Sequence, residues 1–434
     1  MKSEVVLIFA VCIASHLVPW VEAKACKPRD FGRGSIVCVC DEHYCDDIEG
    51  MEGESGRSVL VTSNKAGLRF ERFSLALDED HSGEGPPPTT VAIDRSKKLQ
   101  KVLGFGAAFS DSTSINIKKL PDKLRLRLLR DYFGQDGLEY NMGRVPLGAT
   151  DFSVRKYTYN DVDNDEEMVN MQLAEEDLDF KTCSVAMRGV DQRDFVKLDL
   201  GPELKKAGLT PDKLKLFILD DNLPYIPEVV DTILQDTEAA KYVSGVATHW
   251  YETSDESWQL LDGIHENYPD QEIVSTEACN GYLKLYEEAV TLGNWTRAER
   301  YAVDILQSFK HWNTAWIDWN LALDMEGGPN WVNNTVDAPI IINHEEGEYY
   351  KNPMFYAIGQ FSKFVPPGSV RIESSESKSK SSLMQVAFET PEKEVVLVVI
   401  NRSENEKVIR VKEGSRDFSI HLSPESINTA IWKA

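Results

Sequence analysis

Carboxylate and aromatic side chains follow directly after several apolar runs in the middle of the chain. Glu277 ends one run, and the other ends are rich in the same residue types: Asp151-Phe152, Asp220-Asp221-Asn222, His249-Trp250-Tyr251 and Asp318-Trp319-Asn320. Aromatic rings stack on the apolar faces of sugars, carboxylates and amides bind hydroxyl groups, and glycoside hydrolysis needs two carboxyl groups. A single strand-end acid is more often a solvated charge, but the set favours a sugar site with Glu277 as its best-placed acid.

The runs that carry these residues alternate with helical patterns. Strand-like runs cover residues 102–105, 140–147, 215–219, 245–250, 273–276 and 315–319, with helical patterns such as 121–133 and 298–310 between them. This alternation is typical of a parallel α/β sheet, and a (β/α)8 barrel carries its working residues at the C-terminal ends of its strands. The pattern predicts a TIM barrel, of which six βα units are visible.

The missing units fall between the second and third runs. Only residues 148–214 separate them, and residues 154–195 hold one short apolar run, 183–187. Each βα unit takes roughly 30 residues. Two complete units and the flanking helix and loop therefore do not fit, and we expect an abbreviated barrel that lacks about two units.

Both ends of the chain have strand patterns of another kind. Residues 24–98 and 366–434 contain short alternating runs separated by polar turns. We expect them to combine into one β-sandwich beside a barrel domain at 99–365. Residues 1–23, a lysine followed by an apolar run and small residues, resemble a signal peptide. No later run approaches twenty apolar residues, so a transmembrane anchor is not expected.

Cysteines and sequons agree with secretion. An even cluster near the start of the mature chain favours two disulfides over a zinc site, because its spacing fits no usual zinc pattern. The cluster consists of Cys26, Cys38, Cys40 and Cys45. Cys183 and Cys279 are expected to be buried free thiols. Glycosylation sequons begin at Asn294, Asn333 and Asn401.

The formal net charge of −24 argues against a nucleic-acid partner. It would also repel an anionic membrane at neutral pH, and this repulsion would weaken at acidic pH as carboxylates become protonated.

The motifs at the strand ends resemble those of glucosylceramidases, retaining β-glucosidases. The matching phrases run in family order over nearly the whole mature chain: the Cys26 to Cys45 cluster, Gly104-Phe-Gly-Ala-Ala, Arg144-Val-Pro, Asp151-Phe-Ser, Tyr157-Thr-Tyr, His249-Trp-Tyr, Ser275-Thr-Glu-Ala-Cys279, Asp318-Trp-Asn-Leu-Ala-Leu and Gly327-Gly-Pro-Asn-Trp331. The resemblance implies a (β/α)8 barrel beside a β-sandwich. It also implies hydrolysis of glucosylceramide in sphingolipid catabolism, with neither metal nor cofactor.

Roles for single residues follow from the same resemblance. It makes Glu277 the nucleophile that forms a covalent glucosyl-enzyme. It implies that Asp151, Trp319 and Asn334 contact the glucose. It also implies that Arg144, His249 and Tyr251 orient the nucleophile. Membrane glucosylceramide, a saposin-like activator and anionic lipid are the implied partners, and the lysosome, or secretion, is the implied destination.

One departure stands out. The family places its acid/base on an Asn-Glu-Pro motif at the end of the fourth strand, and this motif does not occur in the chain. Asp220 and Asp221 are the nearest replacements by strand order, but intact family members also carry acids there. The alternative to glucosylceramide hydrolysis is therefore a secreted, catalytically inactive sugar-binding protein or a non-functional truncated form.

Overall fold

The computed structural model describes residues 24–48, 58–77, 89–146, 148–160, 162, 169–170, 188–377 and 382–433. Three sheets organise this part of the chain, one of six strands, one of nine and one of five. The expected signal peptide at 1–23 and the thiol of Cys183 lie outside the described residues.

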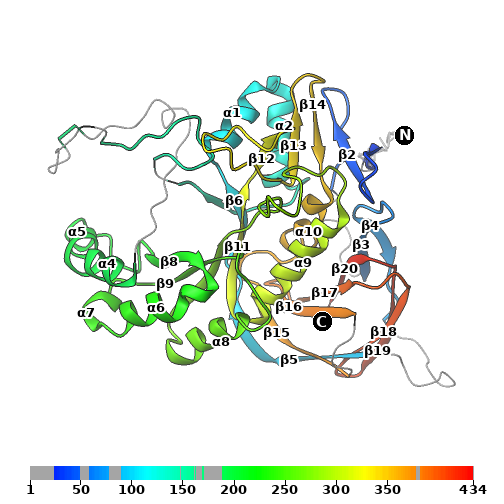
Figure 1. Ribbon diagram of the computed structural model, residues 1–434. Coiled ribbons are helices and arrows are strands. Elements are labelled where there is room, and N and C mark those ends of the chain that lie inside the picture. Colours follow the sequence, from blue (N-terminus) through cyan, green and yellow to red (C-terminus); the bar gives the residue numbers. More distant parts are fainter. Residues whose placement is uncertain are drawn as a thin grey trace, which may run out of the picture.

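The six-stranded sheet is parallel and forms the incomplete barrel (Figure 1). Its order is β7-β6-β11-β10-β9-β8. The strands are β6 (Gly104–Ala108), β7 (Met142–Arg144), β8 (Phe217–Asn222), β9 (Gly245–His249), β10 (Glu272–Glu277) and β11 (Asn313–Asn320). These are the six predicted strands. In the described sheet β7 and β8 are the edges, so the two missing strands fall between them as expected.

Helices follow the strands in the βα manner. The longer ones are α1 (Asp111–Lys119), α2 (Asp122–Phe133), α6 (Ile226–Leu234), α8 (Trp258–Asn267), α9 (Trp295–Lys310) and α10 (Pro353–Ser362). The shorter ones are α4 (Gly189–Asp194), η1 (Phe195–Leu200), α5 (Gly201–Lys206), η2 (Leu223–Tyr225) and α7 (Thr237–Ala240). In α9 the side chains of Ala298, Tyr301, Ile305 and Phe309 recur every three to four residues and are buried, which places one apolar face against the sheet.

The nine-stranded sheet joins the two ends of the chain. It consists of β3 (Val59–Asn64), β4 (Glu71–Ser74), β5 (Thr90–Lys101), β15 (Val370–Glu376), β16 (Leu383–Glu389), β17 (Glu394–Asn401), β18 (Lys407–Glu413), β19 (Arg416–Leu422) and β20 (Ser426–Lys433). β3 pairs antiparallel with β20, and β5 with β15. Side chains from both ends, among them Val91, Leu397, Phe418 and Trp432, share one core. The predicted β-sandwich built from both ends is confirmed.

Not all of residues 24–98 belong to this sandwich, so that prediction was wrong in part. β1 (Pro28–Asp30) and β2 (Ile36–Cys40) instead join β12 (Ala322–Asp324), β13 (Ile340–Asn343) and β14 (Glu348–Lys351) in the five-stranded sheet. The sequence of β2 explains this position. Four of its five residues are buried, so the strand needs cover on both faces.

The cluster forms two disulfides, as predicted, and the structure pairs Cys26 with Cys38 and Cys40 with Cys45. Because Cys40 and Cys45 are bonded to each other, their group with Asp46 offers no thiolates to a metal. Cys279 is a buried free thiol, as expected.

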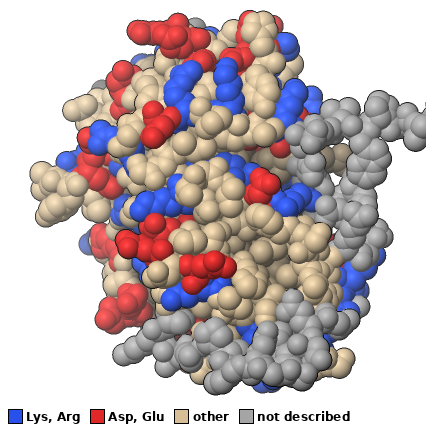
Figure 2. Space-filling model, turned by 90° about the vertical axis from the view of Figure 1, so that its right-hand side faces the viewer, with Lys and Arg blue, Asp and Glu red and all other residues tan. Residues whose placement is uncertain are grey.

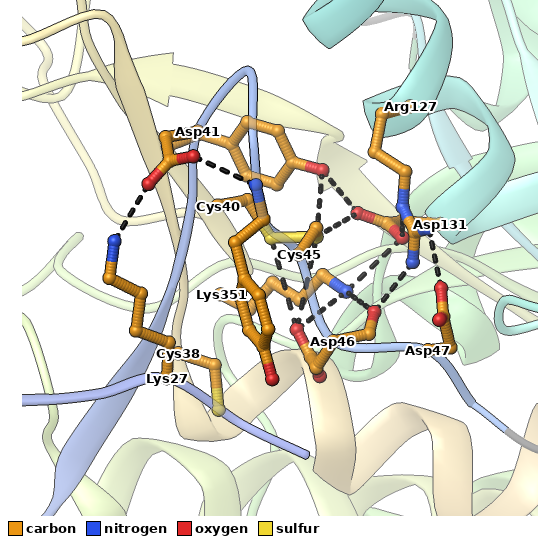
Figure 3. The surroundings of a disulfide bond; sticks show 12 residues. Lys27, Cys38, Cys40, Asp41, Cys45, Asp46, Asp47, Arg127, Asp131 and Lys351 are labelled. Atoms are coloured by element: carbon orange, nitrogen blue, oxygen red, sulfur yellow. Dashed lines mark hydrogen bonds and ion pairs between the residues drawn. A yellow bond between two sulfur atoms is a disulfide. The ribbon is translucent and has the colours of Figure 1, made fainter. Parts of the chain in front are cut away.

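Beside the second disulfide, buried charges tie the N-terminal segment to the barrel (Figure 3). The Nζ atom of Lys351, which is fully buried, lies 3.0 Å from Asp46 Oδ1 and 3.1 Å from Asp131 Oδ1. Arg127 donates to Asp131 over 2.9 Å and also to Asp47. This network, to which the Asp46 carbonyl oxygen also contributes by accepting from Lys351 and Arg127, connects the segment after the Cys40–Cys45 disulfide with α2 and β14.

The three sequons differ in their surroundings. Asn333 is exposed, and the half-buried Asn294 caps α9 by accepting from Arg297 N at 3.3 Å. Asn401 is fully buried, and its Nδ2 atom donates to the carbonyl oxygens of Asn405 and Ser423. A glycan bonds to that nitrogen, so burial contradicts the prediction for Asn401.

Acidic and basic side chains are interspersed on the face seen in Figure 2. Among the described residues, no helix has both the length and the apolar character needed to cross a bilayer.

Candidate active site

Glu277 stands at the C-terminal end of β10, where the strand departs from regular pairing. The register between β10 and β9 shifts between Ser275 and Glu277, and such an irregularity re-aims the side chains beside it. The Glu277 carboxylate accepts from Tyr251 Oη at 2.8 Å and from Arg144 Nη1. Its side chain is 14% exposed, so it is held by two donors but remains accessible.

Arg144 comes from the end of β7 and serves two carboxylates. Besides Glu277 it donates from Nη2 to Asp220 Oδ2 at 3.0 Å. Burial alone would lower the pKa of Arg144, but the charges of Glu277 and Asp220 raise it above its usual value. The site therefore contains a permanent cation beside the Glu277 carboxylate.

Asp220 lies at the end of β8, on a distorted backbone. Leu219 and Asp220 have φ of +74° and +49°, and the register with β9 shifts between Leu219 and Asp221. The Asp220 Oδ1 atom lies 3.0 Å from His249 Nε2 and accepts from Thr276 Oγ1 at 2.6 Å. Burial opposes its charge, yet the hydrogen bond from His249 and the positive charge of Arg144 hold the pKa of Asp220 well below its usual range. An acid with a depressed pKa is a poor proton donor, which argues against Asp220 as a replacement acid/base.

Asp151 and Asn334 meet on a second side of the site. Asn334 Nδ2 donates to Asp151 Oδ2 at 2.8 Å. Burial raises the pKa of Asp151, the Asn334 hydrogen bond opposes this shift, and the charge of Glu277 adds to it. That electrostatic effect places Asp151 within the field of Glu277. The loops after β7 and β12 thus contribute a matched carboxylate and amide.

Trp319 links the two sides. It lies on β11 at a register shift between Asp318 and Asn320, and it is 4% exposed. The Arg144 guanidinium carbon stands 4.9 Å from the centre of its ring, and Phe152 packs edge-on against it at 6.1 Å. Six of the seven residues that the resemblance selected therefore lie at or just after the C-terminal ends of barrel strands, and the seventh, Asn334, reaches Asp151 from the loop after β12.

Sequence reasoning missed several supporting residues. Thr276 binds Asp220, Tyr282 Oη donates to the Tyr251 carbonyl at 3.2 Å, and Cys279 Sγ lies 3.4 Å from Tyr251 Oη. Thr276 and Cys279 flank Glu277 within the Ser275-to-Cys279 motif, and this position was the signal that could have found them. Tyr282 lies outside the motifs, so no comparable signal marks it. Asp318 is buried, accepts from Tyr301 Oη at 2.6 Å and has a pKa raised well above its usual value by burial.

Two family profiles match the chain. The Glycosyl hydrolase family 30 TIM-barrel domain matches residues 102–189 and 182–365, and the Glycosyl hydrolase family 30 beta sandwich domain matches residues 368–430. The chain belongs to glycosyl hydrolase family 30. In this family 30 glycoside hydrolase the two parts of the barrel match meet at residues 182–189. These residues lie between β7 and β8, the two edge strands of the described sheet.

Two curated relatives align with almost their whole length. "Lysosomal acid glucosylceramidase" of Mus musculus is 32% identical over 502 residues, covering 95% of this chain and 96% of its own. "Putative glucosylceramidase 3" of Caenorhabditis elegans is 34% identical over 500 residues, covering 94% of this chain and 95% of its own. Both alignments are longer than the 434-residue chain, so each relative has residues without a counterpart here.

Among solved structures, SrfJ from Salmonella typhimurium superposes with a TM-score of 0.75. Its identity is 20%, with 87% of this chain and 100% of that chain covered. At this identity the likeness supports the fold alone.

Proposed function

We propose that this chain cleaves β-glucosides through a covalent glucosyl-Glu277 intermediate, with glucosylceramide as its natural class of substrate. The observation that carries the proposal is the geometry of Glu277, a strand-end carboxylate held by Tyr251 and Arg144. A nucleophilic carboxylate acts in its ionised form, next to groups that orient it. The names of the worm and mouse relatives supply the substrate class.

The contacts of the other site residues indicate two roles, glucose binding and positioning of the nucleophile. Asp151 and Asn334 present an acceptor and an amide that suit sugar hydroxyls, and the Trp319 ring packs against Phe152 and Arg144. His249 acts through Asp220, and Tyr251 acts directly on Glu277. We assign the first three to glucose binding and the remainder to positioning of the nucleophile.

The leaving group decides how fast the first step runs. Protonation of a leaving oxygen by a positioned acid contributes typically about 10²–10⁴-fold. The chain has no Asn-Glu-Pro motif, and Asp220 is held ionised. We expect reaction with an activated aryl β-glucoside, whose leaving group needs no proton, and turnover of glucosylceramide slower by about that factor.

A mechanism-based inactivator, a 2-deoxy-2-fluoro-β-glucoside with a dinitrophenol leaving group, tests the nucleophile. Intact-mass and peptide analysis should find one 2-deoxy-2-fluoroglucosyl ester on Glu277. Glu277→Gln should abolish it, and Glu272→Gln, a matched change at the opposite end of β10, should retain it. Labelling that persists in Glu277→Gln would overturn the assignment.

The same experiment distinguishes this enzyme from the alternative, a sugar-binding protein without catalytic activity. It is favoured by the depressed pKa of Asp220, which removes a candidate proton donor from the site. Such a protein would bind the glucoside reversibly and acquire no label.

Destination and partners belong to the same proposal. We infer entry into the secretory pathway and action at the lumenal side of lysosomal membranes, aided by anionic lipid and a saposin-like activator. The two disulfides and the lysosomal name of the mouse relative support this inference. Fractionation of source cells tests it, and recovery in the cytosol would contradict it.

A further inference from the structure

One glycosylation sequon lies within the candidate active site. It consists of Asn333, Asn334 and Thr335, and the Nδ2 atom of its middle residue donates to Asp151 at 2.8 Å. Of the three sequon asparagines, all of which the structure describes, Asn333 alone is exposed. Its φ of +58° lies in the left-handed region, which asparagine adopts more readily than most residues. A glycan on Asn333 would begin one residue away from a proposed glucose contact.

The segment that carries this sequon is fastened to the loops on either side of it. Trp331 Nε1 donates to the carbonyl oxygen of Thr150, in the loop after β7, at 2.7 Å. Lys284, in the loop after β10, donates from Nζ to Thr335 Oγ1 at 3.2 Å. Asn333 therefore offers a fixed point of attachment where the loops after β7, β10 and β12 meet.

Large apolar side chains are exposed on two of these loops. Trp331 and Val332, directly before the sequon, are 44% and 47% exposed. Leu285 and Tyr286, in the loop after β10, are 88% and 85% exposed. Exposed apolar groups of this kind are typical of surfaces that meet a membrane or another protein. A glucoside whose lipid part remains in a bilayer reaches the nucleophile only if these loops approach the membrane.

A glycan and a bilayer exclude each other at this position. Transfer of an apolar side chain from water into a bilayer stabilises membrane binding, in proportion to the apolar area buried. The hydroxyl groups of a glycan lose hydrogen bonds to water against hydrocarbon, which costs free energy. Because an N-linked glycan is also bulky, one on Asn333 would keep Trp331 and Val332 out of the bilayer. A small soluble glucoside needs no such contact.

We propose that Asn333 carries an N-linked glycan and that this glycan selects substrates by their location. With the glycan in place, the site hydrolyses soluble β-glucosides and is held away from glucosides that are anchored in a membrane. Once the glycan is removed or trimmed, the site reaches both. The inference rests on the proposed function, because it concerns the regulation of the same site.

The full-length chain, secreted by a host that attaches high-mannose glycans, tests the inference. Peptide mapping should find a glycan on Asn333. Two aryl β-glucosides with the same leaving group are compared, one soluble and one held in phosphatidylcholine vesicles by a long alkyl chain on its aryl group. Endoglycosidase H, which leaves a single sugar on the asparagine, should raise the ratio of the vesicle rate to the soluble rate. We expect about tenfold or more, because burial of one large apolar side chain is worth at least that factor.

Two variants identify the responsible glycan. Asn333→Gly removes the sequon and suits the left-handed backbone, so its ratio should be high from the start and should not respond to the endoglycosidase. Thr296→Ala removes the sequon at Asn294 and retains the Asn294 side chain that caps α9. This matched control should respond to trimming as the unchanged protein does.

The outcomes separate the inference from the proposed function. An unmodified Asn333, or a ratio that trimming does not change, would overturn the inference while hydrolysis of the soluble glucoside upholds the proposed function. If neither glucoside reacts and Glu277 acquires no label, the proposed function fails. Sedimentation of the protein with the same vesicles, which needs no catalysis, then decides the inference. Vesicle binding that increases about tenfold on trimming supports it, and unchanged binding overturns it.

Discussion

Three site residues lie at or beside irregularities near the ends of their strands. The register shifts around Asp220 in β8, around Thr276 just before Glu277 in β10, and around Trp319 in β11. A regular strand points alternate side chains to opposite faces, whereas an extra residue re-aims those that follow it. Through these shifts, side chains from separate strands converge on Arg144, which contacts all three residues.

Tyr251 supplies one of the two donors to Glu277, so Tyr251→Phe tests orientation without changing shape. A hydrogen bond to a charged group is worth about 1.5–3 kcal/mol. We therefore expect the rate of glucosyl-enzyme formation to fall about 10- to 100-fold, measured from the burst of dinitrophenol. Tyr286→Phe is the matched control, because Tyr286 is 85% exposed. An unchanged burst rate in Tyr251→Phe would show that Arg144 alone positions the carboxylate.

At the scale of elements, β14 is held to the N-terminal segment by a buried cation. Lys351→Met keeps the length of the side chain and leaves Asp46 and Asp131 buried without their shared partner. Removing one partner of a buried ion pair costs about 3–5 kcal/mol. Urea unfolding should show a loss of this size, against little change for Lys310→Met at an exposed site. A loss below about 1 kcal/mol would mean that Arg127 compensates both carboxylates.

The sequence was most informative where a strand is buried on both faces. The run predicted at 245–250 corresponds to the strand Gly245–His249, and the run predicted at 315–319 corresponds to the strand Asn313–Asn320. Both predictions succeed because continuous apolar runs mark strands in the interior of a parallel sheet. The run at 140–147 shrank to Met142–Arg144. Two local causes explain this: Tyr140 N bonds to Tyr132 O, and Pro146 has no N–H for a ladder.

Other features depend on contacts between distant segments, which no local pattern encodes. β2 pairs with β14, more than 300 positions later in the chain, so its membership of the five-stranded sheet was not predictable. The burial of Asn401 follows from packing of the loop at 401–405 against Ser423. The left-handed backbone at Asp220 accompanies contacts of its side chain with Arg144, His249 and Thr276, which come from other strands.

At the scale of the whole molecule, the sandwich pairs strands from both ends of the chain, whereas the described strands of the barrel do not form a closed sheet. β3 and β5 precede the barrel and pair with β20 and β15, which follow it. In sequence, the barrel strands therefore lie between the two groups of strands that form the sandwich. The described parallel sheet has two edges, β7 and β8, and the Arg144–Asp220 ion pair joins their C-terminal ends.

Buried carboxyl groups should make the whole protein most stable in acid. Asp304 is 6% exposed, accepts from Trp316 Nε1 at 2.8 Å and has its pKa raised to about 7 by burial. Between about pH 4 and pH 7 the folded state keeps a proton that the unfolded state has released. The folded state then binds more protons, so the free energy of unfolding decreases as pH rises through this window.

The expected slope for one such group is about 1.4 kcal/mol per pH unit, or about 4 kcal/mol from pH 4 to pH 7. Asp304→Asn keeps the acceptor for Trp316 and removes the titration, so its unfolding free energy should depend less on pH by that amount. Thermal and urea unfolding at several pH values measure the difference. The net charge of −24 also destabilises the protein at neutral pH, but it changes by only one unit in the variant and equally in the surface control Asp270→Asn. Parallel pH profiles for all three proteins would show that Asp304 is ionised in the folded state and that repulsion among surface carboxylates sets the pH dependence.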